Sequence, residues 1–369
     1  MSDLSKISVV LPSLDPDEKL HLVIEGLLEY GFTDIILVND GSKPENLHYF
    51  EDEAAAHPDV IHLLHHEVNK GKGAALKNAF NWFLQNRPDA AGVVTVDGDN
   101  QHHPADTKAC ALNMMETGHI TLGCRDFNQA DVPARSSFGN KTTSTIFKIF
   151  VGMTISDTQT GLRAIPREDL EYIATIQGDR FEYETNMLLG MKQQGIPFDE
   201  VKIRTVYIEE NKSSHFHPIR DSWRIYKLIL AHFFRYTISS LLGSVVETGL
   251  LAGFNLILRN LLTGIALTAA TAIPARIISC LFNFFLNKYM VFKTNVSTST
   301  AMVRYWILAV FQMAVQFLAD EALYILLGVG SSATGLRVVI HTVVMVCLYF
   351  MSFMIQQRWV FAADKKERV

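Results

Sequence analysis

Four long apolar segments in the C-terminal part of the 369-residue chain constrain its fold more than any other feature. Each is about 18 to 25 residues long, which is the length that an α-helix needs to cross the hydrocarbon core of a bilayer. Four in succession, separated by short polar turns, favour membrane-spanning helices over buried helices of a soluble core. We place the spans at about 237–258, 264–286, 305–329 and 338–355.

These segments contain a repeat. The dipeptide RY at 235–236 recurs at 304–305, and NFFLNKYMVF at 283–292 recurs as SFMIQQRWVF at 352–361, with the same offset of 69 residues. The repeating unit is therefore a hairpin of two helices that is present twice. Because each hairpin crosses the membrane twice, both copies should have the same orientation.

Charge placement predicts that orientation. The 288–304 connection carries three basic residues and no acidic one, and the C-terminal tail is also rich in lysine and arginine, whereas the loops 259–263 and 330–335 are nearly uncharged. Basic loops stay in the cytoplasm, so both termini should be cytoplasmic. The first residues show no signal peptide. None of the four cysteines forms a C-x-x-C pair, which predicts reduced, buried thiols.

The N-terminal part, 1–215, resembles a soluble α/β domain. Short β-rich runs at 7–11, 35–38, 60–64 and 93–96 alternate with helical patterns at 17–30, 44–57 and 72–86. This alternation predicts a Rossmann-like, mostly parallel sheet covered on both faces. Ligands of such sheets bind at the carboxyl ends of the strands. The net charge of −5 gives no indication of nucleic-acid binding, and the chain is compatible with a homo-oligomer.

The junction at 216–234 has the pattern of an amphipathic helix. Apolar residues recur at steps of three and four, and basic residues run beside them. This pattern is typical of a helix on an anionic bilayer surface, although a helix packed on the soluble domain is the alternative. The apolar residues are Ile219, Trp223, Tyr226, Leu230 and Phe233, and the basic ones are Arg220, Arg224 and Lys227.

Two carboxylates follow the fourth predicted strand, in the sequence DGDNQH. Asp97 and Asp99 are one residue apart on a turn, and together with Gln101 they offer the hard oxygen ligands that Mg²⁺ and Mn²⁺ prefer. Such a cation would neutralise the charge that builds up on a departing nucleoside diphosphate. An ordinary acidic turn is the alternative. His102 and His103 are more consistent with structural or indirect roles, since imidazole suits softer metals.

Two further loops also follow strands or open helices. Asp40, in VNDGS, has a carboxylate that suits a nucleobase N–H or a ribose hydroxyl, with an ordinary Asp-Gly turn as the alternative. The segment NKGKGAAL opens a helix, where glycines let the backbone approach a phosphate and Lys72 adds charge. It lacks the spacing of a Walker A loop.

The motifs VVLP, VNDGS, NKGKGAAL, DGDNQH and DTQTGLR occur in this order over about 160 residues. In this order they resemble the family 2 glycosyltransferases with the GT-A fold, specifically the polyprenyl-phosphate branch that includes dolichol-phosphate mannose synthases. The apolar half, with RY and NFFLNKYMVF, resembles the GtrA family, whose members are thought to help lipid-linked sugars cross the membrane. These resemblances cover nearly the whole chain.

The resemblance implies roles for individual residues on the donor side. Pro12 and Asp40 would line the base and ribose, and Lys72 would lie near the donor. Asp97 and Asp99, with Gln101, would hold the metal and the diphosphate. The usual Asn-Glu after the proline is replaced by PSLDPDE, which leaves Asp15, Asp17 and Glu18 as alternatives for the glutamate.

On the acceptor side, the resemblance assigns arginines to the phosphate of a polyprenyl phosphate. Arg125, in GCRDF, matches well, whereas Arg135 and Ser136 match more loosely. Arg163 and Asp157, in DTQTGLR, would border the acceptor. In FEYET, Glu182 and Glu184 would add an acidic pair, one of which would bind Arg163.

A mechanism follows from the acceptor. A phosphate monoester is largely anionic at neutral pH, since its second pKa is about 6, so catalysis would need positioning and charge stabilisation more than a base. We therefore expect direct displacement at the sugar C1 with inversion. The candidate catalytic residues are Asp97, Asp99 and Asp157, the last as a base in the less favoured variant. A UDP-hexose is favoured as donor, with GDP-mannose as the alternative.

Acidic and basic residues within the spans are costly and usually meaningful. Glu247, Arg276, Asp320 and Glu321 either line a path for a lipid-linked sugar or hold the helices together, for example through a pair of Glu247 with Arg276.

Two other classes compete with the transferase. A processive polysaccharide synthase normally has a Q-x-x-R-W motif after its core, but the only similar string, QRW at 357–359, lies in the last apolar segment. A transporter with a regulatory soluble domain is disfavoured by the complete set of donor motifs.

Overall fold

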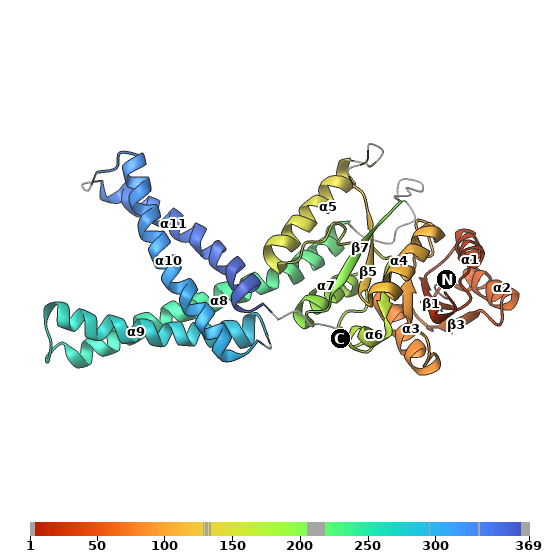
Figure 1. Cartoon of the computed structure of the whole chain (residues 1–369), viewed down its shortest axis with the longest axis horizontal. Coiled ribbons are helices and arrows are strands. Elements are labelled where there is room, and N and C mark those ends of the chain that lie inside the picture. Colours follow the sequence, from red (N-terminus) through yellow and green to blue (C-terminus); the bar gives the residue numbers. More distant parts are fainter. Residues whose placement is uncertain are drawn as a thin grey trace. The chain divides into compact units, whose positions relative to one another are not determined.

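A computed structural model describes residues 4–127, 129, 132, 134–204, 218–294, 296–330 and 333–362. The chain divides into two compact units (Figure 1). Unit 1 comprises Met1–Lys148, Met153–Leu228 and Lys365–Val369, and unit 2 comprises Ile149–Gly152 and Ile229–Asp364. The predicted domain boundary at 215 lies outside the described residues.

Unit 1 is built on a seven-stranded sheet with the strand order β3-β2-β1-β4-β6-β5-β7. Neighbouring strands are parallel except that β6 runs antiparallel to β4 and β5. The mostly parallel sheet predicted from the sequence is therefore confirmed. The strands are β1 (Ile7–Ser13), β2 (Ile35–Asn39), β3 (Ile61–His65), β4 (Gly92–Thr95), β5 (Ile120–Arg125), β6 (Arg163–Pro166) and β7 (Phe198–Ile203).

Helices cover both faces of this sheet. Val9 and Leu11 of β1 point into a core that also contains Leu20 and Cys110, from α1 and α4. Alternation along the strand directs Val10 to the other face, where α3 contacts β1 and β2. The helices are α1 (Lys19–Glu29), α2 (His48–Ala56), α3 (Lys72–Asn86), α4 (Pro104–Thr117), α5 (Ala134–Ile146), α6 (Arg167–Ala174) and α7 (Glu182–Gln194), with short helices η1 (Leu4–Lys6), η2 (Pro44–Asn46) and η3 (Phe147–Val151).

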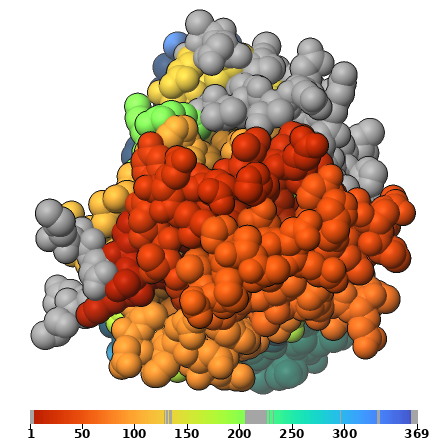
Figure 2. Space-filling model, turned by 90° about the vertical axis from the view of Figure 1, so that its right-hand side faces the viewer, coloured from red at the N-terminus to blue at the C-terminus, as the bar shows by residue number. Residues whose placement is uncertain are grey.

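The N-terminal strands and helices form one outer side of unit 1. Residues coloured red to orange, from the first part of the chain, make up most of the face seen in Figure 2. The helix predicted at 44–57 is divided there into η2 and α2, whereas the helix predicted at 72–86 has the observed bounds of α3.

Unit 2 is helical. Figure 1 shows α8 with α9, and α10 with α11, as two hairpins. Its four long helices have the length and composition to cross a membrane, and many of their large apolar side chains are exposed, as in Ile265 and Leu326. Exposed apolar surface of this extent suits contact with lipid. Helix α8 (Pro218–Leu258) begins in unit 1 and belongs to unit 2 from Ile229 onward. The other elements are α9 (Gly264–Leu286), η5 (Asn287–Val291), α10 (Thr298–Leu326), α11 (Thr334–Ile355) and η6 (Gln356–Val360).

The helix predicted at 216–234 is the first part of a longer helix, and its place at a bilayer surface stays a prediction. Helix α8 continues without interruption from Pro218 to Leu258. The physical reason is the absence of proline and glycine between residues 219 and 242, since helix breaks normally occur at such residues. Of the stripe residues, Ile219, Arg220, Trp223 and Arg224 have side chains outside the described part.

The sequence repeat is also a structural repeat. The short π-helices η5 and η6 begin at Asn287 and Gln356, which are 69 residues apart, and the Asn287 side-chain amide donates to the Gln356 side-chain oxygen at 3.0 Å. The rings of Phe292 and Phe361, also equivalent positions, stack with centroids 5.0 Å apart. The two hairpins therefore contact each other through equivalent residues.

The charged residues of the spans pair between neighbouring helices. Arg276 of α9 donates to Glu247 of α8 at 2.8 Å, as the pairing alternative predicted. Asp320 lies 2.7 Å from His341. Glu321 and Arg337 form a longer pair at 3.5 Å. These contacts favour a structural role, because each joins the two helices of one hairpin.

Candidate active site

The carboxyl ends of β1, β2 and β4 meet at one edge of the sheet. Pro12 lies in β1 opposite Val38 of β2, Asp40 follows β2, and Asp97 follows β4. In the sheet, β2 lies on one side of β1 and β4 lies on the other. This arrangement is a topological switch point, where open α/β sheets bind their ligands.

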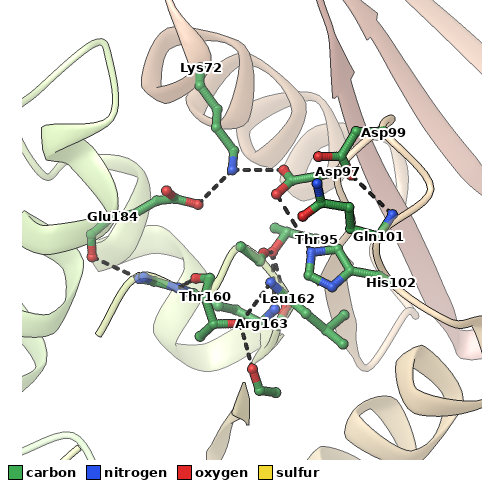
Figure 3. Close-up of polar contacts among 12 residues, drawn as sticks. Lys72, Thr95, Asp97, Asp99, Gln101, His102, Thr160, Leu162, Arg163 and Glu184 are labelled. Atoms are coloured by element: carbon green, nitrogen blue, oxygen red, sulfur yellow. Dashed lines mark hydrogen bonds and ion pairs between the residues drawn. The ribbon is translucent and has the colours of Figure 1, made fainter. Parts of the chain in front are cut away.

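Lys72 connects the two acidic segments of the site (Figure 3). Its amine, at the start of α3, lies 2.7 Å from Oδ1 of Asp97 and 2.9 Å from Oε1 of Glu184, which is in the first turn of α7. The three side chains are mostly buried, with 17%, 29% and 12% of their surface exposed respectively. One lysine thus joins the end of β4 to α7.

Two glycines allow this close packing. Gly71, immediately before α3, has a φ of +102°, which is readily accessible only to glycine. Gly161, in DTQTGLR, passes so close to the site that a Cβ there would lie 2.4 Å from Oδ2 of Asp97. These motif glycines therefore permit backbone to approach the carboxylate.

The electrostatics of the site are dominated by negative charge. Burial on its own would lower the pKa of Lys72, but the carboxylates of Asp97 and Glu184 outweigh it and raise that pKa. For Asp97, burial opposes ionisation, yet Lys72 and His102 hold the pKa well below its usual range. For Asp99, burial and the neighbouring charge of Asp97 raise the pKa.

The residues present fit a divalent cation. Lys72 contacts the carboxylates of Asp97 and Glu184, and Asp99 is close enough to Asp97 for their charges to interact. The carboxylates of Asp97 and Asp99 offer hard oxygen atoms on one turn. The Gln101 backbone N–H donates to Asp99 at 3.1 Å, which fixes the turn. Asp97 and Asp99 are therefore the residues that would hold such an ion.

The two histidines that follow Gln101 contact protein groups. The Nε2 atom of His102 lies 3.5 Å from Oδ2 of Asp97. His103 is the N-cap of α4, where its Nδ1 accepts from the Ala105 backbone N–H.

Asp40 makes internal contacts at this edge of the sheet. Its side chain is buried, and its carboxylate accepts hydrogen bonds from the Lys70 and Gly71 backbone N–H groups at 3.0 and 2.8 Å. His66 also contacts it at 2.7 Å. Asp40 therefore anchors the loop before α3, and its contact with a base or ribose stays a prediction.

Arg125 and Asp157 form one ion pair. Nε and Nη2 of Arg125 donate to the two oxygens of Asp157 at 2.7 and 3.2 Å. Asp157 is fully buried, whereas about a quarter of the Arg125 side chain, 26%, is exposed. Asp157 therefore positions the guanidinium, and an engaged, buried carboxylate is a poor candidate for a general base.

Arg163 is buried beside the site. The side chain is 1% exposed and donates to the backbone carbonyls of Thr160 and Glu184 at 3.0 and 2.8 Å. Arg163 therefore contacts Glu184, one of the expected acidic pair, through its carbonyl, and a role toward the acceptor stays a prediction. The Glu184 carboxylate binds Lys72, and Glu182 accepts from backbone N–H groups at 179 and 180.

The remaining predicted residues are less well defined. Ser136 is partly buried in α5, and the side chain of Arg135 lies outside the described part. Of the acidic residues in PSLDPDE, Asp15 accepts from the Lys43 backbone N–H and from Asn46. The ion pair of Lys72 with Glu184 was not predicted from the sequence. The FEYET motif indicated only that Glu184 belongs to an acidic pair.

Comparison with known proteins gives two family matches. Residues 8–173 match the glycosyl transferase family 2, and residues 235–361 match the GtrA/DPMS transmembrane domain. The chain therefore contains a glycosyl transferase family 2 domain followed by a GtrA/DPMS transmembrane domain, as the motifs predicted.

Curated relatives are similar over the N-terminal part. An uncharacterized protein of Methanocaldococcus jannaschii is 28% identical over 234 residues, which is 62% of this chain and 93% of that protein. The UDP-N-acetylglucosamine–dolichyl-phosphate N-acetylglucosaminyltransferase of Methanococcus voltae is 26% identical, covering 55% and 86%. The polyprenol monophosphomannose synthase of Mycolicibacterium smegmatis is 31% identical, covering 45% and 63%.

Proposed function

We propose that this protein is a membrane-bound, inverting glycosyltransferase that moves a hexose from a nucleotide-sugar to a polyprenyl phosphate. The observation that carries the proposal is the cluster of Asp97, Lys72 and Glu184 at the switch point of the sheet. The names of two relatives support a lipid-phosphate acceptor. They differ in the sugar, so the UDP-hexose remains our preferred donor on sequence grounds.

The chain's own residues would act by positioning and charge. Lys72 would turn from its carboxylates to the donor diphosphate, and Arg125, held by Asp157, would bind the acceptor phosphate through its planar fork. A phosphate oxygen would then form the bond to C1 as the bond to the nucleoside diphosphate breaks. A divalent ion held by Asp97 and Asp99 would supply charge neutralisation to the leaving group.

The acceptor and the basic loops together suggest the cellular arrangement. The four long apolar helices would anchor the protein in the membrane and could aid translocation of the lipid-linked sugar. Because Lys288, Lys293 and Arg304 gather at the connection between the hairpins, we propose that unit 1 and both termini face the cytoplasm.

The test is sugar transfer by the purified full-length chain. Undecaprenyl phosphate would be incubated with radiolabelled UDP- and GDP-sugars and Mg²⁺ or Mn²⁺, with Asp99→Ala as the site variant and Asp89→Ala, an exposed acid, as the matched control. The proposal expects labelled lipid in organic solvent for the native chain and Asp89→Ala but not for Asp99→Ala. Nucleotide release without labelled lipid would reject the acceptor and direct attention to a hydroxyl acceptor.

A further inference from the structure

Unit 2 contains a pocket of about 410 Å³ beside the first hairpin. It lies between the start of the membrane segment of α8 and the end of α9, so it is at the end of the hairpin where the chain enters unit 2. Its wall is largely apolar and includes Leu242 and Leu286. Two cations, Arg235 and Lys293, also line it, and none of its lining residues is acidic.

Neither cation is neutralised in the part of the chain that the structure describes. Arg235 and Lys293 are exposed and form no ion pair there. Lys293 also has a φ of +46°, a left-handed conformation that is unusual for a residue other than glycine. Such strain persists only where the surroundings impose it, and it occurs preferentially at functional positions.

The second hairpin retains only one of these two charges and holds it differently. At the equivalent positions, Arg304 donates to the Trp359 carbonyl at 3.0 Å, and Ala362 replaces Lys293. Arg358, the counterpart of Tyr289, is engaged in other contacts. Among the described residues, both hairpins therefore share one fold, but only the first presents two cations without an ion pair beside an apolar wall.

We propose that this pocket binds polyprenyl phosphate, with the phosphate between Arg235 and Lys293 and the first isoprene units against Leu242 and Leu286. The charge match favours this lipid, because a phosphate monoester carries about −1.5 to −2 at neutral pH, whereas a phospholipid diester leaves one cation unmatched. The site is formed by unit 2 alone. It is therefore a second phosphate site, additional to the one assigned to Arg125. The identity of this lipid as the acceptor rests on the proposed function.

The test maps lipid binding without requiring transfer. The full-length chain in neutral detergent, without donor, would be photolabelled with a diazirine polyprenyl phosphate, and labelled peptides would be identified by mass spectrometry. Labelling is expected in 235–242 and 286–293. Each basic residue at such a surface increases the binding affinity roughly fivefold. Arg235→Gln combined with Lys293→Gln should therefore raise the lipid concentration at half-maximal labelling by about 25-fold. Arg259→Gln, an exposed charge at the other end of α8, is the matched control and should leave labelling unchanged.

Two further arms complete the test. Lys293→Gly removes the charge and suits the positive φ, so its expected fivefold loss cannot come from backbone strain. Unlabelled polyprenyl phosphate should compete at least tenfold better than phosphatidylglycerol or polyprenol. Equal competition by phosphatidylglycerol would reject the assigned lipid. Equal labelling of the second hairpin, at 304–311 and 355–362, would reject the assigned site. Labelling in a chain that transfers no sugar would reject the proposed function while supporting this pocket.

Discussion

Replacement of Lys72 by methionine should make the nucleotide-free protein bind Mn²⁺ more tightly. The amine lies 2.7 Å from an oxygen of Asp97, and a divalent ion on that carboxylate would lie about 2.1 Å from its ligand oxygen. Amine and ion would then be about 4 Å apart, where an effective dielectric of 20 gives roughly 8 kcal/mol of repulsion between charges of +1 and +2. The lysine must therefore leave before the ion binds.

The cost of that departure determines the size of the effect. Lys72 gives up its charged hydrogen bond to Asp97, and such a bond contributes about 1.5 to 3 kcal/mol. Moving the lysine away costs less free energy than the repulsion between the amine and the ion. The cost of this movement is therefore the amount by which Lys72 weakens metal binding in the native chain. Lys72→Met removes the penalty and should lower the Kd for Mn²⁺ by about 10- to 100-fold.

The measurement is a titration of free Mn²⁺ by electron paramagnetic resonance on the full-length chain in detergent. Lys70→Met, an exposed lysine two residues earlier, is the matched control and should leave the Kd unchanged. With donor bound, the gain should shrink and transfer should be slow, because the diphosphate then lacks its lysine. If Lys72→Met bound Mn²⁺ no more tightly than the native chain, the idea that Lys72 competes with the metal would be wrong.

Three further outcomes are expected. Arg125→Ala should raise the KM for polyprenyl phosphate at least tenfold while changing the KM for the donor less than threefold; equal changes in steady-state assays would contradict an acceptor role. Replacing Gln356 by leucine should lower the melting temperature of the full chain in detergent, because the buried Asn287 amide then loses one of its two side-chain acceptors and keeps only Asn283; an unchanged temperature would count against that contact. Burial raises the pKa of Cys110 to about 12, so at pH 8 about one thiol in 10,000 is ionised. Maleimide should therefore modify Cys110 only after unfolding. Rapid modification of Cys110 in the native chain, detected by mass spectrometry, would refute its burial.

The fold could be predicted from the sequence wherever a local pattern determines the structure. The bounds of α3 follow from the glycine before Lys72 and the apolar periodicity after it. The four spans follow from length and hydropathy alone. The helix at the junction follows from its apolar periodicity, and its continuity with the first span follows from the absence of a helix breaker.

The site was less predictable because its contacts depend on tertiary structure. Asp97 and Lys72 belong to recognisable motifs, but their ion pair and the partner Glu184 are brought together only by the folded sheet. For Asp40, the motif predicts a contact with a ligand, but the hydrogen bonds that its carboxylate accepts from Lys70 and Gly71 are formed only in the folded loop. Sequence patterns place polar groups near a site but do not say which of them are already satisfied internally.

The contact between Asn287 and Gln356 has an evolutionary consequence. Residues at the same place in two copies of a repeat meet where a symmetric pair of separate chains would have its rotation axis. In a pair of identical chains, the same amino acid must serve on both sides of that axis. A duplication fused into one polypeptide removes this restriction, so asparagine can face glutamine, and one copy can diverge in charge while the other preserves the shared architecture.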